Sequence, residues 1–133
     1  MKNKVNKKLE IKNYLIILLI VLLIVLIFTF IDFVVHNLSE EYSVPDYYFR
    51  NKIIAGTGIG FITYLFIKKK RLFIKSLIFS AVISILLQIR YFLEGYSLKF
   101  VIEFLFFHFL MLLLASLIIF KIFNKFLKGG KSR

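Results

Sequence analysis

The feature that most constrains this chain is a run of eighteen residues, Tyr14 to Ile31, without a charged side chain. Three further apolar runs follow, from Ile53 to Ile67, from Leu72 to Leu93 and from Phe100 to Phe120. A helix needs about 20 residues to cross the roughly 30 Å of bilayer hydrocarbon. Because 60% of the 133 residues are hydrophobic and the mean hydropathy is +0.86, we expect the chain to fold in lipid.

We therefore predict an all-α integral membrane protein, one compact four-helix domain over residues 1–133. The predicted spans are residues 13–35, 46–67, 72–93 and 98–120, with basic tails at 1–12 and 121–133. The second apolar run is short, so its helix is predicted to begin early, with Ser43 as N-cap and Pro45 in the first turn. A signal peptide is the alternative for the first run. That run is longer than the hydrophobic segment of an ordinary signal peptide, and no cleavage site of small residues follows it.

Basic residues are distributed unequally between the two ends of the predicted helices. The N-terminal tail, the segment 68–75 and the C-terminal tail hold five each, together 15 of the 19 Lys and Arg residues. Lys and Arg in short loops stay on the cytoplasmic side, so we expect a multi-pass cell-membrane protein with both termini in the cytoplasm. There the basic residues would meet anionic lipid head groups. These basic residues are divided among three separate helix ends next to the lipid, so nucleic-acid binding is not expected despite the net charge of +12.

Small residues at four-residue spacing predict close helix packing. Gly56 and Gly60 form a G-x-x-x-G pattern, and Ser76, Ser80 and Ser84 form a ridge on the next helix. In lipid, such residues let helix backbones approach and hydroxyls bond across. A pore lined by the serines would need polar partners on the inner halves of other helices. The inner halves of the first and fourth helices offer almost none, so a continuous water channel is not expected.

Ionisable and amide side chains gather at the predicted external level of all four helices. Because an ionised group facing lipid costs several kcal/mol, such groups tend to face the bundle interior and find partners. We predict an outer-leaflet pocket that binds a ligand through eight residues: Asp32, His36, Arg50, Lys52, Gln88, Arg90, Glu94 and Glu103. The alternative is a ring of interfacial anchors in which Arg90 pairs with Glu94, four residues on.

Asp32 and Glu103 are expected to share one basic partner from the second helix. Arg50 and Lys52 lie about 200° apart on that helix, so only one of them faces inward. Arg50 is favoured, because a guanidinium can hold two carboxylates, whereas the flexible Lys52 is expected to reach for lipid head groups. His108, near the middle of the fourth helix, is expected to hydrogen-bond a serine or to relay protons.

The sequence predicts neither a cofactor nor a metal. The chain has no cysteine, which excludes thiolate centres. Asp32, His36 and Glu40 follow one another at four-residue steps, but no specific metal-binding motif occurs. A bis-histidine haem is disfavoured, because His36 and His108 are expected to differ in depth by about 16 Å.

Three functional classes remain open. The leading one is a binding or transport-type module for an ion, a small polar solute or a lipid head group. The second is a membrane-embedded enzyme acting on a lipid-linked substrate, with His36 or Glu103 as general base and Asp32 as its orienter. The third is an accessory subunit whose glycine face docks on a membrane partner, or on a second copy of the chain. Few ionisable groups lie in the inner halves, which argues against a proton-driven pump.

Single cysteines at Ser43, Lys70, Tyr96 and Ser132 test the predicted orientation, since the chain has no native cysteine. Positions 43 and 96 should react with a membrane-impermeant thiol reagent in intact cells. Positions 70 and 132 should react only after the membrane is permeabilised. Labelling of position 70 from outside would contradict the orientation.

Overall fold

The computed structural model describes residues 1–128, and this part of the chain is helical almost throughout. Its elements are α1 (Lys2–His36), the short 3-10 helix η1 (Glu40–Tyr42), α2 (Tyr47–Ile67), α3 (Leu72–Leu93) and α4 (Leu98–Lys128). The predicted all-helical fold is confirmed. By length and composition α1, α3 and α4 can each cross a membrane. A fourth span at α2, where Arg50, Asn51 and Lys52 lower the hydropathy, stays a prediction, as does the side on which the termini lie.

Two expected helix ends differ from the structure. The N-cap position of α2 is Asp46 rather than Ser43, and Ser43 adopts an extended conformation at the end of η1. Pro45 explains the later start, because a proline disfavours helical backbone at the residue before it. The tails predicted at 1–12 and 121–133 are helical in α1 and in α4 as far as Lys128. Position 132 lies outside the described residues.

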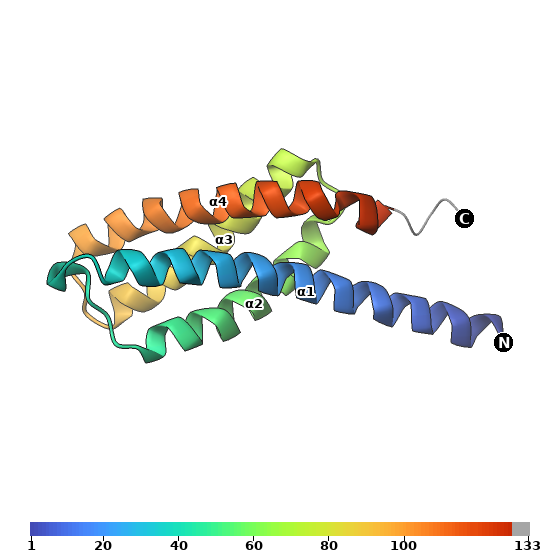
Figure 1. Ribbon diagram of the computed structural model, residues 1–133, viewed down its shortest axis with the longest axis horizontal. Helices are drawn as coiled ribbons and strands as arrows, with labels where there is room; N and C mark the ends of the chain where they lie inside the picture. Colours follow the sequence, from blue (N-terminus) through green and yellow to red (C-terminus); the bar gives the residue numbers. More distant parts are fainter. Residues whose placement is uncertain (129–133) are drawn as a thin grey trace.

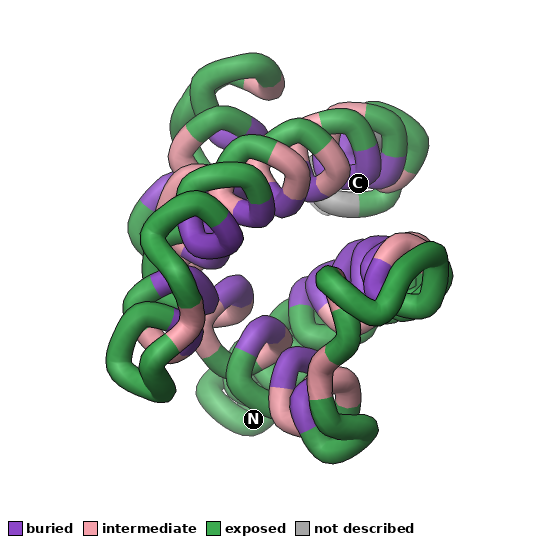
Figure 2. Tube along the Cα trace, turned by 90° about the vertical axis from the view of Figure 1, so that its left-hand side faces the viewer, coloured by how far each residue is buried: buried purple, intermediate pink, exposed green. Residues whose placement is uncertain are grey.

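The four helices form an up-and-down bundle (Figure 1). Each packs on its chain neighbours, α1 also packs on α4, and α3 with α4 makes the most extensive contact. The α1–α2 and α3–α4 connections lie at one end of the bundle, and the first turns of α1 project beyond the other end. The buried segments of all four helices face the middle (Figure 2). Large apolar side chains such as Phe30, Phe66 and Leu93 are exposed, as expected for residues facing lipid.

The buried apolar side chains form two clusters. The larger joins all four helices and includes Val21, Phe79 and Leu112. The smaller is mostly aromatic, includes Tyr91 and Phe104, and lies at the end of the bundle with the α1–α2 connection. The polar residues described in the next section lie where these two clusters meet, because His108 contacts both Phe28 of the larger and Phe104 of the smaller.

The glycines of α2 allow α1 to approach closely. A methyl group at Gly60 would lie 2.8 Å from Val21 and 3.0 Å from Phe79, and one at Gly56 would lie 3.2 Å from Val25. This geometry supports the predicted packing role of both glycines. Because α1 covers this face within the same chain, a docking partner would need another surface.

The three ridge serines of α3 are fully buried, which is also what close packing requires. Two of their hydroxyls bond within α3: Ser80 donates to the Ser76 carbonyl and Ser84 to the Ser80 carbonyl, each at 2.7 Å. The hydroxyl of Ser76 has no hydrogen-bond partner among residues 1–128. The Ser80 and Ser116 hydroxyls lie 3.4 Å apart and link α3 to α4.

Gly60→Ala tests the α1–α2 contact, with Gly58→Ala as its matched control. A methyl group at Gly58 meets no atom within 4 Å, whereas one at Gly60 overlaps Val21. We expect Gly60→Ala to lose about 1–3 kcal/mol of stability through overpacking. Thermal melting in detergent measures this loss, which Gly58→Ala should not share. Equal melting temperatures for the two variants would contradict the packing described.

Candidate functional site

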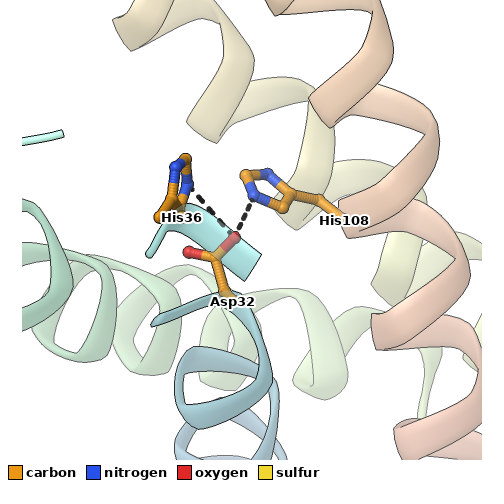
Figure 3. Close-up of side chains that lie close together, drawn as sticks. All are labelled: Asp32, His36 and His108. Carbon is orange, nitrogen blue, oxygen red and sulfur yellow. Dashed lines mark hydrogen bonds and ion pairs between the residues drawn. The ribbon is translucent and has the colours of Figure 1, made fainter. Parts of the chain in front are cut away.

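Asp32, in the last full turn of α1, is the centre of a buried polar site. Its side chain is 0% exposed, and its two oxygens have different partners. Oδ2 forms an ion pair with the ammonium group of Lys52 on α2, which is 3% exposed. Oδ1 lies 2.7 Å from Nε2 of His108 on α4. Figure 3 shows both imidazole rings directed at this carboxylate.

His36 lies one turn after Asp32, and its ring is held on both sides. Its Nδ1 lies 2.5 Å from the carbonyl oxygen of Tyr42, which can only accept, so Nδ1 carries a proton. Its Nε2 faces the site, 3.4 Å from each of Asp32 Oδ1, Lys52 Nζ and the Tyr91 hydroxyl. The ring stacks on Phe104 at a centroid distance of 4.3 Å. The connection after α1 therefore fixes the orientation of His36.

His108 joins α4 to α3 as well as to α1. Its Nδ1 lies 2.6 Å from the amide nitrogen of Gln88, which can only donate, so Nδ1 accepts this hydrogen bond. The ring proton of His108 therefore lies on Nε2, which donates to Asp32. The amide oxygen of Gln88 is buried and has no hydrogen-bond partner among residues 1–128. Each of the four helices thus contributes to one group, which we call the buried polar cluster: Asp32, His36, Lys52, Gln88, Tyr91 and His108.

Aromatic rings surround the charges of the buried polar cluster. The Lys52 ammonium lies 5.1 Å from the ring centre of Tyr91 and 5.5 Å from that of Phe49. Either charge would be costly to bury alone, and the ion pair between Asp32 and Lys52 offsets part of that cost.

The other four predicted pocket residues lie outside this cluster. Arg90 bonds Glu94 at 3.0 Å with both side chains partly exposed, which is the arrangement expected of interfacial anchors. Glu103 is exposed and lies 3.8 Å from Lys99, and Arg50 is exposed. The expectation that Arg50 joins Asp32 to Glu103 inside the bundle is therefore wrong. Lys52 takes the inner position because it shares the face of Gly56 and Gly60, which packs on α1.

The expected difference in depth between the two histidines is also wrong. Their ring centroids lie 6.5 Å apart. The expectation assumed that α1 and α4 reach the same level, but His36, the last residue of α1, stacks on Phe104 rather than on the first residue of α4, Leu98. Helix α4 thus begins roughly 9 Å beyond the end of α1. His108 itself follows Phe104 by four residues on the buried face of α4, a spacing that could have indicated an inward position.

Access to the buried polar cluster is narrow. A cleft of about 70 Å³ between α2 and α3 is lined by Lys52, Tyr91 and Arg90. It has room for a few water molecules, well below the roughly 300–1,000 Å³ of small-molecule pockets. A wider cleft of about 830 Å³ is lined by Tyr14, Tyr64 and the basic α2–α3 turn, and lies at the opposite end of the bundle.

Three members of the buried polar cluster have the chemistry of metal ligands. One ligand atom each from Asp32, His36 and His108 lies within 4.8 Å of the other two. Sequence motifs could not indicate this group, because Asp32 and His108 are 76 residues apart on different helices.

No protein-family model, curated protein or solved structure matches the chain. The chemistry of the site is therefore inferred from its geometry. A buried carboxylate with imidazoles at one oxygen and an ammonium at the other is suited to holding positive charge.

Lys52→Met tests the central ion pair, with Arg50→Met as its control on the same helix. Removing Lys52 leaves the Asp32 carboxylate buried without its counter-ion, and we expect a loss of about 3–5 kcal/mol in stability. Adding Asp32→Asn should recover part of the loss. Arg50→Met should stay within about 0.5 kcal/mol of wild type. Thermal melting that ranks Arg50→Met as the more damaging change would contradict the ion pair.

Proposed function

We propose that this protein is an integral membrane binding or transport-type module for a small cation, and that the buried polar cluster is its binding centre. The observation that carries the proposal is the position of Asp32: fully buried, and contacted by side chains of α2 and α4. Ionisable groups inside a membrane bundle are costly and mark ion or substrate sites more often than they serve packing.

The chemistry and size of the site favour a small cation over the other ligands considered. Asp32 is the only acid of the buried polar cluster, and His36 and His108 direct ring nitrogens at it. A lipid head group or polar solute does not fit a cleft of about 70 Å³. A single ion, with or without a few water molecules, is of the right size.

Lys52 acts in this proposal as a tethered cation that balances Asp32 when no ion is bound. Its side chain lines the cleft between α2 and α3, so its ammonium can move into that cleft without a helix shifting. Four rotatable carbon–carbon bonds give the stem that freedom. An arriving cation would then take over part of the role of Lys52, and the carboxylate would never be left without positive charge.

The enzyme alternative has one observation in its favour. The ring of His36, one of the two bases considered, is oriented by the hydrogen bond from its Nδ1 to the Tyr42 carbonyl, which turns the Nε2 lone pair to the site as a general base requires. A lipid-linked substrate would need α2 and α3 to separate before reaching it. Glu103, the other base considered, lies outside the buried polar cluster. Cation binding requires no such opening and is therefore preferred.

Ligand-dependent thermal stability tests the proposal. The purified protein is melted in detergent at constant ionic strength with Na⁺, K⁺, Mg²⁺, Mn²⁺ or Zn²⁺. At least one cation should raise the melting temperature, because a ligand that binds only the folded state stabilises it.

Two variants connect that shift to the site. The double variant Asp32→Asn with Lys52→Met keeps the cluster uncharged, so it should fold but lose the shift. Glu103→Gln, a change at an exposed acid outside the cluster, should retain it. A folded wild-type protein whose melting temperature responds to none of these cations would overturn the proposal.

A further inference from the structure

We infer that the cation is a first-row transition metal ion of the Zn²⁺ class, ligated by Asp32 Oδ1, His36 Nε2 and His108 Nε2. This inference rests on the proposed cation-binding function and specifies its ligand. Imidazole nitrogen combined with one carboxylate suits Zn²⁺, Fe²⁺ and Co²⁺ better than Na⁺ or Ca²⁺, which prefer oxygen. Three protein ligands leave a fourth position open to water or a further oxygen.

The distances between the three ligand atoms are close to those a metal requires. Oδ1 of Asp32 lies 3.4 Å from Nε2 of His36 and 2.7 Å from Nε2 of His108, and all three atoms lie within 4.8 Å of one another. Ligands about 2.0–2.1 Å from a tetrahedral ion lie about 3.3 Å apart. Small side-chain rotations can produce that spacing, and the bundle need not rearrange. The hydroxyl of Tyr91, 3.4 Å from Nε2 of His36, is near enough to offer a fourth oxygen.

The second ring nitrogen of His36 already has the partner that metal-binding histidines use. Such histidines donate their other N–H to a carbonyl or a carboxylate, which fixes the tautomer and turns the lone pair to the metal. Nδ1 of His36 donates to the Tyr42 carbonyl at 2.5 Å. Its Nε2 therefore presents a lone pair to the site, where the Lys52 ammonium and the Tyr91 hydroxyl lie 3.4 Å away as donors in the metal-free protein. A metal would take the place of these donors, and the bond from Nδ1 to the Tyr42 carbonyl would stay unchanged.

Gln88 can provide the same support for His108. Metal binding at Nε2 moves the ring proton of a neutral His108 to Nδ1, which then needs an acceptor. A half-turn of the Gln88 amide replaces its nitrogen, 2.6 Å from Nδ1, by its oxygen. That oxygen is one of four buried side-chain atoms without a hydrogen-bond partner among residues 1–128, and the half-turn gives it one. The amide can thus support both the metal-free and the metal-bound tautomer.

Lys52 does not occupy the proposed metal position. It pairs with Oδ2 of Asp32, whereas the imidazoles face Oδ1. Its positive charge nevertheless opposes that of a metal ion, and its Nζ is 3.4 Å from Nε2 of His36. Removing this charge should strengthen metal binding, and the metal should in turn compensate Asp32 for the ammonium it has lost.

Equilibrium dialysis of the intact chain against Zn²⁺, with metal counted by mass spectrometry, tests the assignment directly. The protein is purified with a tag that contains no histidine and is stripped with a chelator. His36 and His108 are the only histidines, and there is no cysteine, so other imidazole or thiolate sites do not exist in the chain.

One Zn²⁺ per chain is expected. Affinity should fall at least tenfold in His36→Gln and in His108→Gln. Co²⁺ bound in place of Zn²⁺ should show the visible absorption of a low-coordinate site.

Lys52→Met provides a second readout that a purely structural cluster would not give. This variant should melt below wild type without metal, regain stability in Zn²⁺, and bind Zn²⁺ more tightly than wild type.

Zn²⁺ binding that is unchanged in both histidine variants would overturn the assignment. If Na⁺ or Mg²⁺ stabilises the protein through Asp32 and Zn²⁺ does not bind, the metal assignment is wrong and the cation-binding function stands. Failure of every cation overturns both.

Discussion

A carboxylate inside an apolar bundle has to be matched by positive charge or hydrogen-bond donors, and the arrangement of the helices follows from how Asp32 meets this need. Its two oxygens hold Lys52 of α2 and His108 of α4, and His108 in turn bonds Gln88 of α3. One side chain of α1 thereby fixes the relative positions of all four helices. Apolar packing in lipid specifies such positions weakly, because lipid tails are as apolar as leucine.

Packing and charge depend on the same face of α2. Lys52, Gly56 and Gly60 follow at four-residue steps, so the glycines that admit Val21 and Val25 of α1 also bring Lys52 to Asp32. A bulkier residue at Gly60 would push apart the helices that carry the ion pair. At the other side of the site, the segment after α1 places the Tyr42 carbonyl on His36, and Phe104 covers the ring. The site is therefore preorganised before any ligand arrives.

The lengths of the apolar runs were enough to predict four helices, and the bounds of α3, 72–93, agree with the structure because charged and glycine residues border that run. They could not predict which residues would meet. Helical periodicity indicates that only one of Arg50 and Lys52 faces inward. The bidentate geometry of a guanidinium favours Arg50, but Lys52 is the residue that pairs with Asp32. The outcome depended on which face of α2 packs on α1. Residue spacing predicts too great a depth for His108, because sequence gives depth only within a helix, whereas the offset between α1 and α4 arises from tertiary packing.

The two histidines also allow the most direct measurement of this arrangement, because they should give two separate signals in a nitrogen-15 NMR spectrum of the histidine-labelled, metal-free protein. With its Nδ1 on the Tyr42 carbonyl, His36 should hold its proton on Nδ1, and with its Nε2 on Asp32, His108 should hold a proton on Nε2. Both protons should exchange slowly with water, because both rings are buried. Two rings that average rapidly between tautomers and exchange freely with water would contradict the central position of Asp32.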